Sequence, residues 1–321
     1  MDAAGSTCDT DTDIYIQPLA MESKDDKRIE DRRRFHEPKL PVCTSEPPTF
    51  PSEQVQLFRD VLLFMNEKSI PYVVSGTFAL HEHTGIWRQT KDMDLFVTPG
   101  DMRRALELFK AAGYETWVKD PVWLGKVVRG KHFVDLITCM SNAVLQVDKS
   151  WIERGVEADV SGILSRVLGA EELLASKIFV VRRERFDGAD VVHIIYAMRD
   201  LLDWNRVFQL VGDHWEMLLW SLVFFRYIYP RHANEIPRWV WHDLLARFER
   251  DLIDPKLDAP FRGSLIDENM FAIDVQEWGM ENEIEKYRAA HHKRLKRIEK
   301  KEGLVIADEL HQPSPGKEPA A

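Results

Sequence analysis

The chain has 321 residues, of which 45% are hydrophobic and 30% are charged, and its formal net charge is −10. This composition is typical of a globular protein, and the acidic balance argues against wholesale attraction to nucleic acid or to an anionic membrane. The three cysteines are far apart and odd in number, so they form neither a disulfide framework nor a zinc pattern. This cysteine usage favours a reducing cytoplasm.

Residues 1–50 are polar and then rich in proline, and we expect a disordered or loosely packed leader there, with no apolar signal segment. A first helix is expected from Ser52, which would act as its N-cap. The longest apolar run, residues 217–225, is shorter than the roughly 20 residues that cross a membrane. It therefore predicts a buried core helix and no membrane partner.

Strands and helices alternate in the next part of the chain. Apolar runs and turn residues predict strands at 71–76, 93–99 and 131–139, and helices at 77–85 and 101–113, the latter capped by Asp101. From about residue 165 the pattern becomes helical throughout, with Asp187 and Asp190 expected to cap one helix. The predicted divisions are a leader (1–50), an α/β core (51–160), a helical domain (161–285), and a basic helix with a disordered tail (286–321).

Two carboxylates lie within the strand predicted at 93–99 and its approach. Side chains alternate along a strand, so Asp92 and Asp94 point to one face while Met93 and Leu95 point to the other. Two neighbouring acids repel each other, and burial strengthens the conflict. A divalent cation resolves it, because hard ions prefer several oxygen ligands.

A third acid, Asp135, lies between apolar residues on the following strand. If this strand pairs with the one that carries Asp94, three carboxylates converge and can hold two Mg²⁺ ions for a phosphoryl-type displacement. The alternative interpretation of Asp135 is an ordinary hydrogen-bonded aspartate at the end of a strand.

A glycine turn precedes these acids. The stretch "SGTFAL" predicts a strand, a turn at Gly76 and a helix that begins near Thr77. Backbone amides at the start of this helix, together with the Thr77 hydroxyl, would suit an anion. A phosphate seat and acids for magnesium together indicate the binding of a nucleoside triphosphate.

The order of these residues resembles a known signature. Gly76-Thr77 followed by Asp92-Met93-Asp94 is similar to the glycine-serine…Asp-x-Asp signature of the DNA polymerase β-like nucleotidyltransferase superfamily. The stretch 75–97 resembles its bacterial minimal branch, and residues 169–195 resemble the helical segment of AbiEii-like members. The resemblance covers roughly residues 55–200. It implies a nucleotidyltransferase fold, in which a small mixed sheet is flanked by helices and followed by a C-terminal all-helical region.

The resemblance also implies roles for matching positions. Asp92, Asp94 and Asp135 would be catalytic and bind metal, with Asp135 as the base for the incoming hydroxyl. The residues implied to bind nucleotide are Gly76, Thr77, Arg88, Lys91 and Lys177. The implied enzyme is a cytoplasmic transferase that moves NMP from an NTP such as ATP to an unidentified hydroxyl acceptor, with Mg²⁺ as cofactor.

Two alternatives stay open at this point. One is a toxin of the AbiEii type that modifies tRNA or protein, which the basic helix at 286–300 mildly favours and the acidic net charge does not. The other is a non-catalytic nucleotide-binding protein of the same fold, because Thr77 stands where serine or a second glycine is usual.

Overall fold

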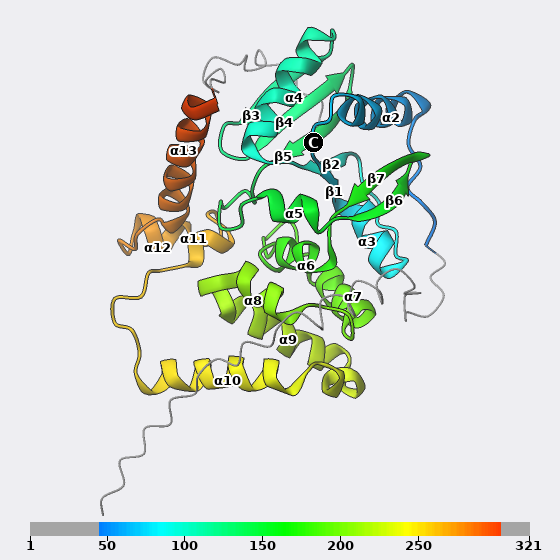
Figure 1. The fold of residues 1–321 in the computed structure, drawn as a ribbon. Helices are drawn as coiled ribbons and strands as arrows, with labels where there is room; N and C mark the ends of the chain where they lie inside the picture. Colours follow the sequence, from blue (N-terminus) through cyan, green and yellow to red (C-terminus); the bar gives the residue numbers. More distant parts are fainter. Residues whose placement is uncertain (1–44, 303–321) are drawn as a thin grey trace, which may run out of the picture. The chain divides into compact units, whose positions relative to one another are not determined.

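A mixed sheet of seven strands organises the first half of the protein (Figure 1). The computed structural model describes residues 45–302, except for the side chains of Glu299, Lys301 and Glu302. The strand order is β3-β4-β5-β2-β1-β7-β6. The strands are β1 (Val73–Val74), β2 (Met93–Phe96), β3 (Glu115–Asp120), β4 (Leu124–Arg129), β5 (His132–Ile137), β6 (Val156–Val160) and β7 (Ile163–Val167).

The two strands that carry the acids are neighbours in the sheet. β2 and β5 run parallel, with Asp94 opposite Asp135 in the register. Met93, Leu95 and Val134 are fully buried on the other face, where they belong to the hydrophobic core. The alternation of side chains therefore gives one apolar face and one acidic face, as the sequence predicted.

Four helices accompany the sheet. α2 packs on β5 and β7, and α4 packs on β3 and β4. α3 contacts both the sheet and the later helices α6 and α7. The four helices are α2 (Ser52–Glu67), α3 (Gly76–Thr84), α4 (Pro99–Ala111) and the short α5 (Lys149–Glu153).

The second half is helical, as the sequence predicted. Its longest elements are α9, α10 and α13, and short 3₁₀ turns at Gly212–His214 and Pro230–Glu235 flank α9. The helices are α6 (Ala170–Ile178), α7 (Gly188–Met198), α8 (Trp204–Val211), α9 (Trp215–Ile228), α10 (Arg238–Ile253), α11 (Gly263–Ile266), α12 (Ala272–Gln276) and α13 (Glu283–Glu302). Among the described residues, no helix is both long enough and apolar enough to cross a membrane.

A buried ion cluster joins α6 to α8 and to the end of α5. The Glu172 carboxylate has no solvent exposure, and Arg206 Nε lies 2.8 Å from its Oε1. Arg154 Nε lies 3.5 Å from the same oxygen. The neighbouring Glu171, also fully buried, accepts a hydrogen bond of 2.7 Å from the Asp203 amide. A carboxylate buried this deeply requires charged partners, so the cluster fixes α6 against α8 and the end of α5.

Several local predictions need correction. Thr98, not Asp101, is the N-cap of α4, because its hydroxyl accepts a hydrogen bond from the Asp101 amide and Pro99 occupies the first helical position. The N-cap of α2 is Pro51 rather than Ser52. The hairpins β3–β4 and β6–β7 were not predicted, and β6–β7 crosses residue 160, where the predicted core ended.

α9 is only partly the buried core helix that the sequence predicted. Leu218, Leu222 and Phe225 are fully buried, whereas Trp220 and Val223 are about half exposed. The expected disordered leader and tail lie outside the described residues, except for residues 45–50. In that segment, the Phe50 ring packs edge-on against Phe58.

Candidate functional site

Three carboxylates converge where β2 lies beside β5. Asp92, Asp94 and Asp135 each offer one oxygen, and these oxygens all lie within 4.8 Å of one another. All three side chains line a cleft of about 740 Å³. The convergence predicted from the sequence is present, because the parallel pairing of β2 and β5 brings Asp94 opposite Asp135.

The electrostatics of these acids favour a bound cation. Burial, and after it the neighbouring charges of Asp92 and Asp135, raise the pKa of Asp94 from 3.8 to about 7. Burial also raises the pKa of Asp135, to about 6, against the opposing effect of Lys126. Hard carboxylate oxygens in this arrangement are the donors that Mg²⁺ prefers. The donor set therefore fits the divalent metal that the sequence implies.

Gly76 lies directly against this acidic cluster. Its φ of +62° belongs to the left-handed region, and a Cβ at this position would lie 3.0 Å from Asp94 Oδ2. The Ser75 amide donates to the Asp94 carbonyl, which ties the turn to β2. The first amides of a helix lack partners within the helix. The start of α3 therefore brings hydrogen-bond donors beside the acids, as expected of a phosphate seat.

Thr77 serves this turn differently from the prediction. Its hydroxyl accepts a hydrogen bond of 2.8 Å from the Arg88 amide and donates one of 2.9 Å to the Arg88 carbonyl. The side chain thus holds the segment around Arg88 against the start of α3. To bind an anion, the hydroxyl would have to withdraw its single hydrogen from the Arg88 carbonyl, so the backbone amides are the better donors.

A buried lysine lies on the helical wall of the cleft. Lys177 on α6 is 8% exposed, and its Nζ lies 2.7 Å from Asp187 Oδ2 and 2.8 Å from Asp190 Oδ2. Arg185 holds Asp187 through two further hydrogen bonds of 2.9 and 2.8 Å. Asp187 does occupy the N-cap position of α7, but its side chain makes no capping bond. The predicted capping position is therefore present, but the carboxylate pairs with Lys177 and Arg185 rather than with an amide of α7.

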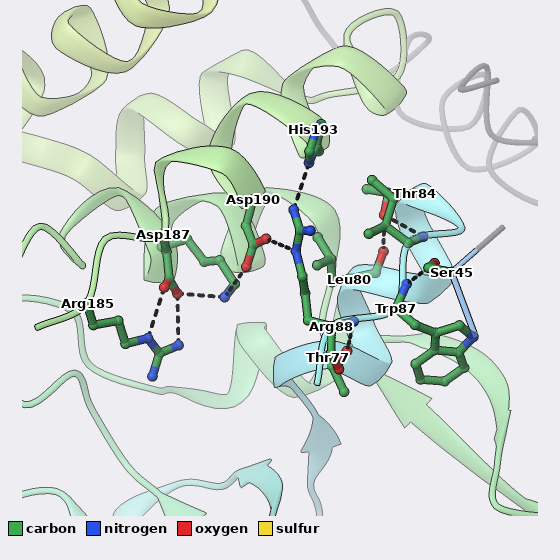
Figure 2. Close-up of polar contacts among 12 residues, drawn as sticks. Ser45, Thr77, Leu80, Thr84, Trp87, Arg88, Arg185, Asp187, Asp190 and His193 are labelled. Atoms are coloured by element: carbon green, nitrogen blue, oxygen red, sulfur yellow. Dashed lines mark hydrogen bonds and ion pairs between the residues drawn. The ribbon is translucent and has the colours of Figure 1, made fainter. Parts of the chain in front are cut away.

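Arg88 connects the start of α3 to this cluster. Its Nε lies 2.9 Å from Asp190 Oδ1, and its Nη2 lies 3.0 Å from His193 Nδ1 (Figure 2). Burial and the Arg88 charge lower the pKa of His193, which favours the neutral ring. Asp190 therefore bridges Arg88 and Lys177, and holds two positive groups at the edge of the cleft.

The structure separates one predicted site residue from the others. Lys91 is exposed, and it does not belong to the residues that line the cleft. The spacing of residues in a loop does not fix the direction of a side chain, whereas the alternation along β2 fixes that of Asp94.

Lys126 is a site residue that sequence reasoning missed. It lies opposite Asp135 in the β4–β5 register, and its Nζ lies 2.6 Å from Asp135 Oδ1. The ammonium group also lies 3.7 Å from the centre of the Phe133 ring. The alternating stretch 124–137, interrupted at Gly130, carries the hairpin signal that would have placed Lys126 beside the acid.

Comparison with known proteins identifies a family. A family model described as "Nucleotidyltransferase of unknown function (DUF6036)" matches residues 54–229, more than half of the chain. A search of curated proteins finds no match. An antigenic nucleotidyltransferase-like protein from Paracoccidioides brasiliensis has a similar structure, with 17% identity, a TM-score of 0.38, and coverage of 60% of this chain and 94% of that one. JHP933 from Helicobacter pylori is also similar, with 12% identity, a TM-score of 0.31, and coverage of 79% and 98%.

Proposed function

Because the chain belongs to this family of nucleotidyltransferases, DUF6036, we propose that it transfers a nucleoside monophosphate from an NTP to a hydroxyl acceptor and releases pyrophosphate. The observation that supports this proposal is the convergence of Asp92, Asp94 and Asp135 directly beside Gly76. NTPs are cytosolic metabolites, so we place the reaction in the cytoplasm.

In the proposed reaction, the three acids hold the metal and the start of α3 binds phosphate oxygens through its backbone amides. Two Mg²⁺ ions would supply charge neutralisation of the triphosphate and of the leaving pyrophosphate. Lys177 and Arg88 add positive charge at the helical wall, where Asp187 and Asp190 fix their positions. Catalysis of this kind depends on positioning and on electrostatic stabilisation rather than on a covalent intermediate.

Asp135 is the proposed base. Its carboxylate takes the proton of the acceptor hydroxyl while the hydroxyl oxygen forms a bond to the α-phosphorus. The bond from the α-phosphorus to the bridging oxygen breaks, and pyrophosphate leaves with that oxygen. Lys126 holds one Asp135 oxygen at 2.6 Å and opposes the effect of burial on its pKa, which keeps the carboxylate ionised near neutral pH.

The test combines binding and chemistry. The full chain is incubated with each α-labelled NTP, beginning with ATP, and with Mg²⁺ and panels of small-molecule, RNA and protein acceptors. We expect a Mg²⁺-dependent rise in Tm with NTP, because a ligand of the native state must stabilise it, and transfer of label to one acceptor class. The Asp92→Ala variant should lose the transfer, whereas Asp258→Ala, at an exposed position, should retain it. An unchanged Tm with every Mg-NTP and no labelled product would refute the proposal.

The ion pair between Lys126 and Asp135 supports a second candidate, a nucleotide-binding protein without catalysis. A lysine that permanently occupies Asp135 Oδ1 would block its use as a base. This version predicts that NTP raises the Tm while the native chain labels no acceptor, and that Lys126→Ala, which frees Asp135 Oδ1, gains labelling.

A further inference from the structure

The last long helix, α13, has a strongly basic outer face. Residues 286–301 contain eight lysines or arginines and one glutamate, in a chain whose formal net charge is −10. Ile284, His291 and Leu295 are buried and attach the helix to the rest of the protein. The exposed lysines and arginines of α13 are Lys286, which pairs with Glu281 and Glu283, and Lys293, Arg294, Lys296, Arg297 and Lys300. Charges interact over a Debye length of about 8 Å at physiological salt, so this face attracts anions in spite of the acidic total.

The α13 helix is connected to the candidate active site. Arg288 Nη1 donates a hydrogen bond of 3.0 Å to the Ser141 carbonyl, and Ser141 lines the cleft that holds the acids. A second depression of about 170 Å³ is lined by Ile284 and Arg288 of α13. Both depressions share Ser141, Asn142, Arg182 and Glu184 among their lining residues. The start of α13 thus borders a depression that shares its lining with the cleft.

A second basic element lies between these two depressions. Residues 182–186 form an exposed turn closed by a hydrogen bond of 2.8 Å from the Arg182 amide to the Arg185 carbonyl. Three of its five residues are arginines, and Arg182 donates to the Ser141 hydroxyl. Phe186 ends the turn and is one of the residues that line the cleft.

The Phe186 ring is exposed and held in place. It is 49% exposed, and its centre lies 5.9 Å from the ring of Trp220, which is 42% exposed. A Cβ on Gly188 would lie 2.1 Å from Phe186 Cζ, so this ring position depends on glycine. Two neighbouring aromatic rings that are both about half exposed form an apolar patch, and such a patch on a protein surface often marks a binding site.

We propose that the acceptor is RNA, and that a single-stranded RNA segment docks along α13 and the 182–186 turn with its ribose hydroxyl directed to Asp135. The assignment rests on the proposed function. The lysines and arginines of α13 and of the turn suit a phosphate backbone, and the exposed rings of Phe186 and Trp220 suit unpaired bases. Among nucleic acids, RNA offers a ribose hydroxyl at every residue, which the transfer to a hydroxyl requires. An acidic protein would use the cations and leave the two rings without a role.

The test removes three exposed cations of α13 together, in the variant Lys293→Ala, Arg297→Ala and Lys300→Ala. The matched control, Arg238→Ala, Arg250→Ala and Lys256→Ala, changes the net charge equally at exposed positions on α10 and the segment after it. Binding of a labelled single-stranded RNA of about 20 nucleotides is measured by anisotropy across salt concentrations. Each lost phosphate contact lowers the salt slope by about 0.7, so we expect a decrease of about 2 and an affinity loss of about tenfold or more in the first variant. The control should bind as the native chain does.

A third variant, Trp220→Ala, tests the rings. It should weaken binding of single-stranded RNA by about fivefold or more, since stacking on one ring contributes ~1–3 kcal/mol, and it should leave the salt slope unchanged. Transfer of labelled NMP to RNA should then require more RNA in both variants, while the rise in Tm with Mg-NTP stays at the native value.

Equal losses in the α13 variant and its control would overturn the proposal, as would binding of DNA or an acidic peptide in preference to RNA. A native chain whose Tm rises with NTP but which binds no RNA would overturn this inference alone. A chain that binds RNA as expected but shows neither a Tm rise nor transfer would instead overturn the proposed function, and with it the assignment of RNA as the acceptor.

Discussion

Replacement of Asp94 by asparagine is expected to stabilise the metal-free protein. Burial and the charges of Asp92 and Asp135 raise the pKa of Asp94 to about 7, which means that the folded state disfavours its ionised form. Asparagine has nearly the same shape and carries no charge. The variant should therefore unfold at higher temperature in the presence of a chelator, and it should lose NMP transfer because a metal ligand is missing.

The magnitude follows from the shift in the Asp94 pKa. The folded state raises it from 3.8 by about 3 units, and each unit corresponds to 1.36 kcal/mol, so the ionised carboxylate costs up to about 4 kcal/mol. Because the folded pKa is raised, the wild-type protein is not penalised below pH 3.8 and loses stability as pH rises to about 7. At pH 5 only a small part of the Asp94 carboxyl groups of the folded state is ionised, so the cost is clearly smaller than at pH 8.

The assay is thermal or urea unfolding with a chelator at pH 5 and at pH 8, with the exposed Asp258→Asn as the control. A domain of this size gains about 2–4 °C in Tm for each kcal/mol, so we expect an increase of at least about 5 °C for Asp94→Asn at pH 8 and a smaller one at pH 5. Saturating Mg²⁺ should reduce the difference in Tm between Asp94→Asn and the wild type, because the ion stabilises the wild-type protein, which has all three carboxylates. The reasoning is wrong if Asp94→Asn matches the wild type at pH 8, or if its advantage does not decrease towards pH 5.

Three further substitutions test other parts of the structure. Gly76→Ala places a Cβ at a φ of +62° and 3.0 Å from Asp94 Oδ2, so it should cost about 1–2 kcal/mol in urea unfolding and reduce transfer more than tenfold; full activity would contradict the close approach. Burial lowers the pKa of His291 to about 4, so the wild type should lose up to about 3 kcal/mol as pH falls from 6.5 to 4, whereas His291→Leu should show a flatter pH dependence of unfolding. Arg206→Met leaves the buried Glu172 without its 2.8 Å partner and should cost about 3–5 kcal/mol, part of which Glu172→Gln in the same chain should restore; equal stability of the single and double variants would refute this role.

The strands that could be predicted from the sequence are those whose apolar residues reach the core. β2 and β5 bury Met93, Leu95 and Leu136 completely, so their period of two is visible, and with it the direction of the acids. β3 and β6 are the edge strands of the sheet and carry mostly polar or half-exposed residues. Edge strands face solvent on one side and bear charges, so their pattern resembles that of a loop.

The site contacts that could not be predicted from the sequence are those between elements that are distant in the chain. Asp187 precedes an apolar helix, which is the usual place of a capping residue. Its pairing with Lys177 depends on how α6 packs against α7, and no local spacing contains that information. The same holds for Lys126, whose contact with Asp135 requires the β4–β5 register. The common direction of Asp92 and Asp94 could be predicted because two residues that are two positions apart in one extended segment determine their own relative position. The place of Asp135, in contrast, required the assumption that β5 pairs with β2.

The three acids differ in what already neutralises them, and this difference indicates where the need for metal is greatest. Asp135 has Lys126 at 2.6 Å, so a protein cation offsets part of its charge before any metal binds. The cations that lower the pKa of Asp94 are Arg185 and Lys177, and each of these is itself in contact with Asp187. Their effect on Asp94 is therefore exerted at longer range, and burial outweighs it. A divalent ion at the cluster consequently relieves Asp94 most, which is why the substitution of this residue, rather than that of Asp135, should separate stability from activity most sharply.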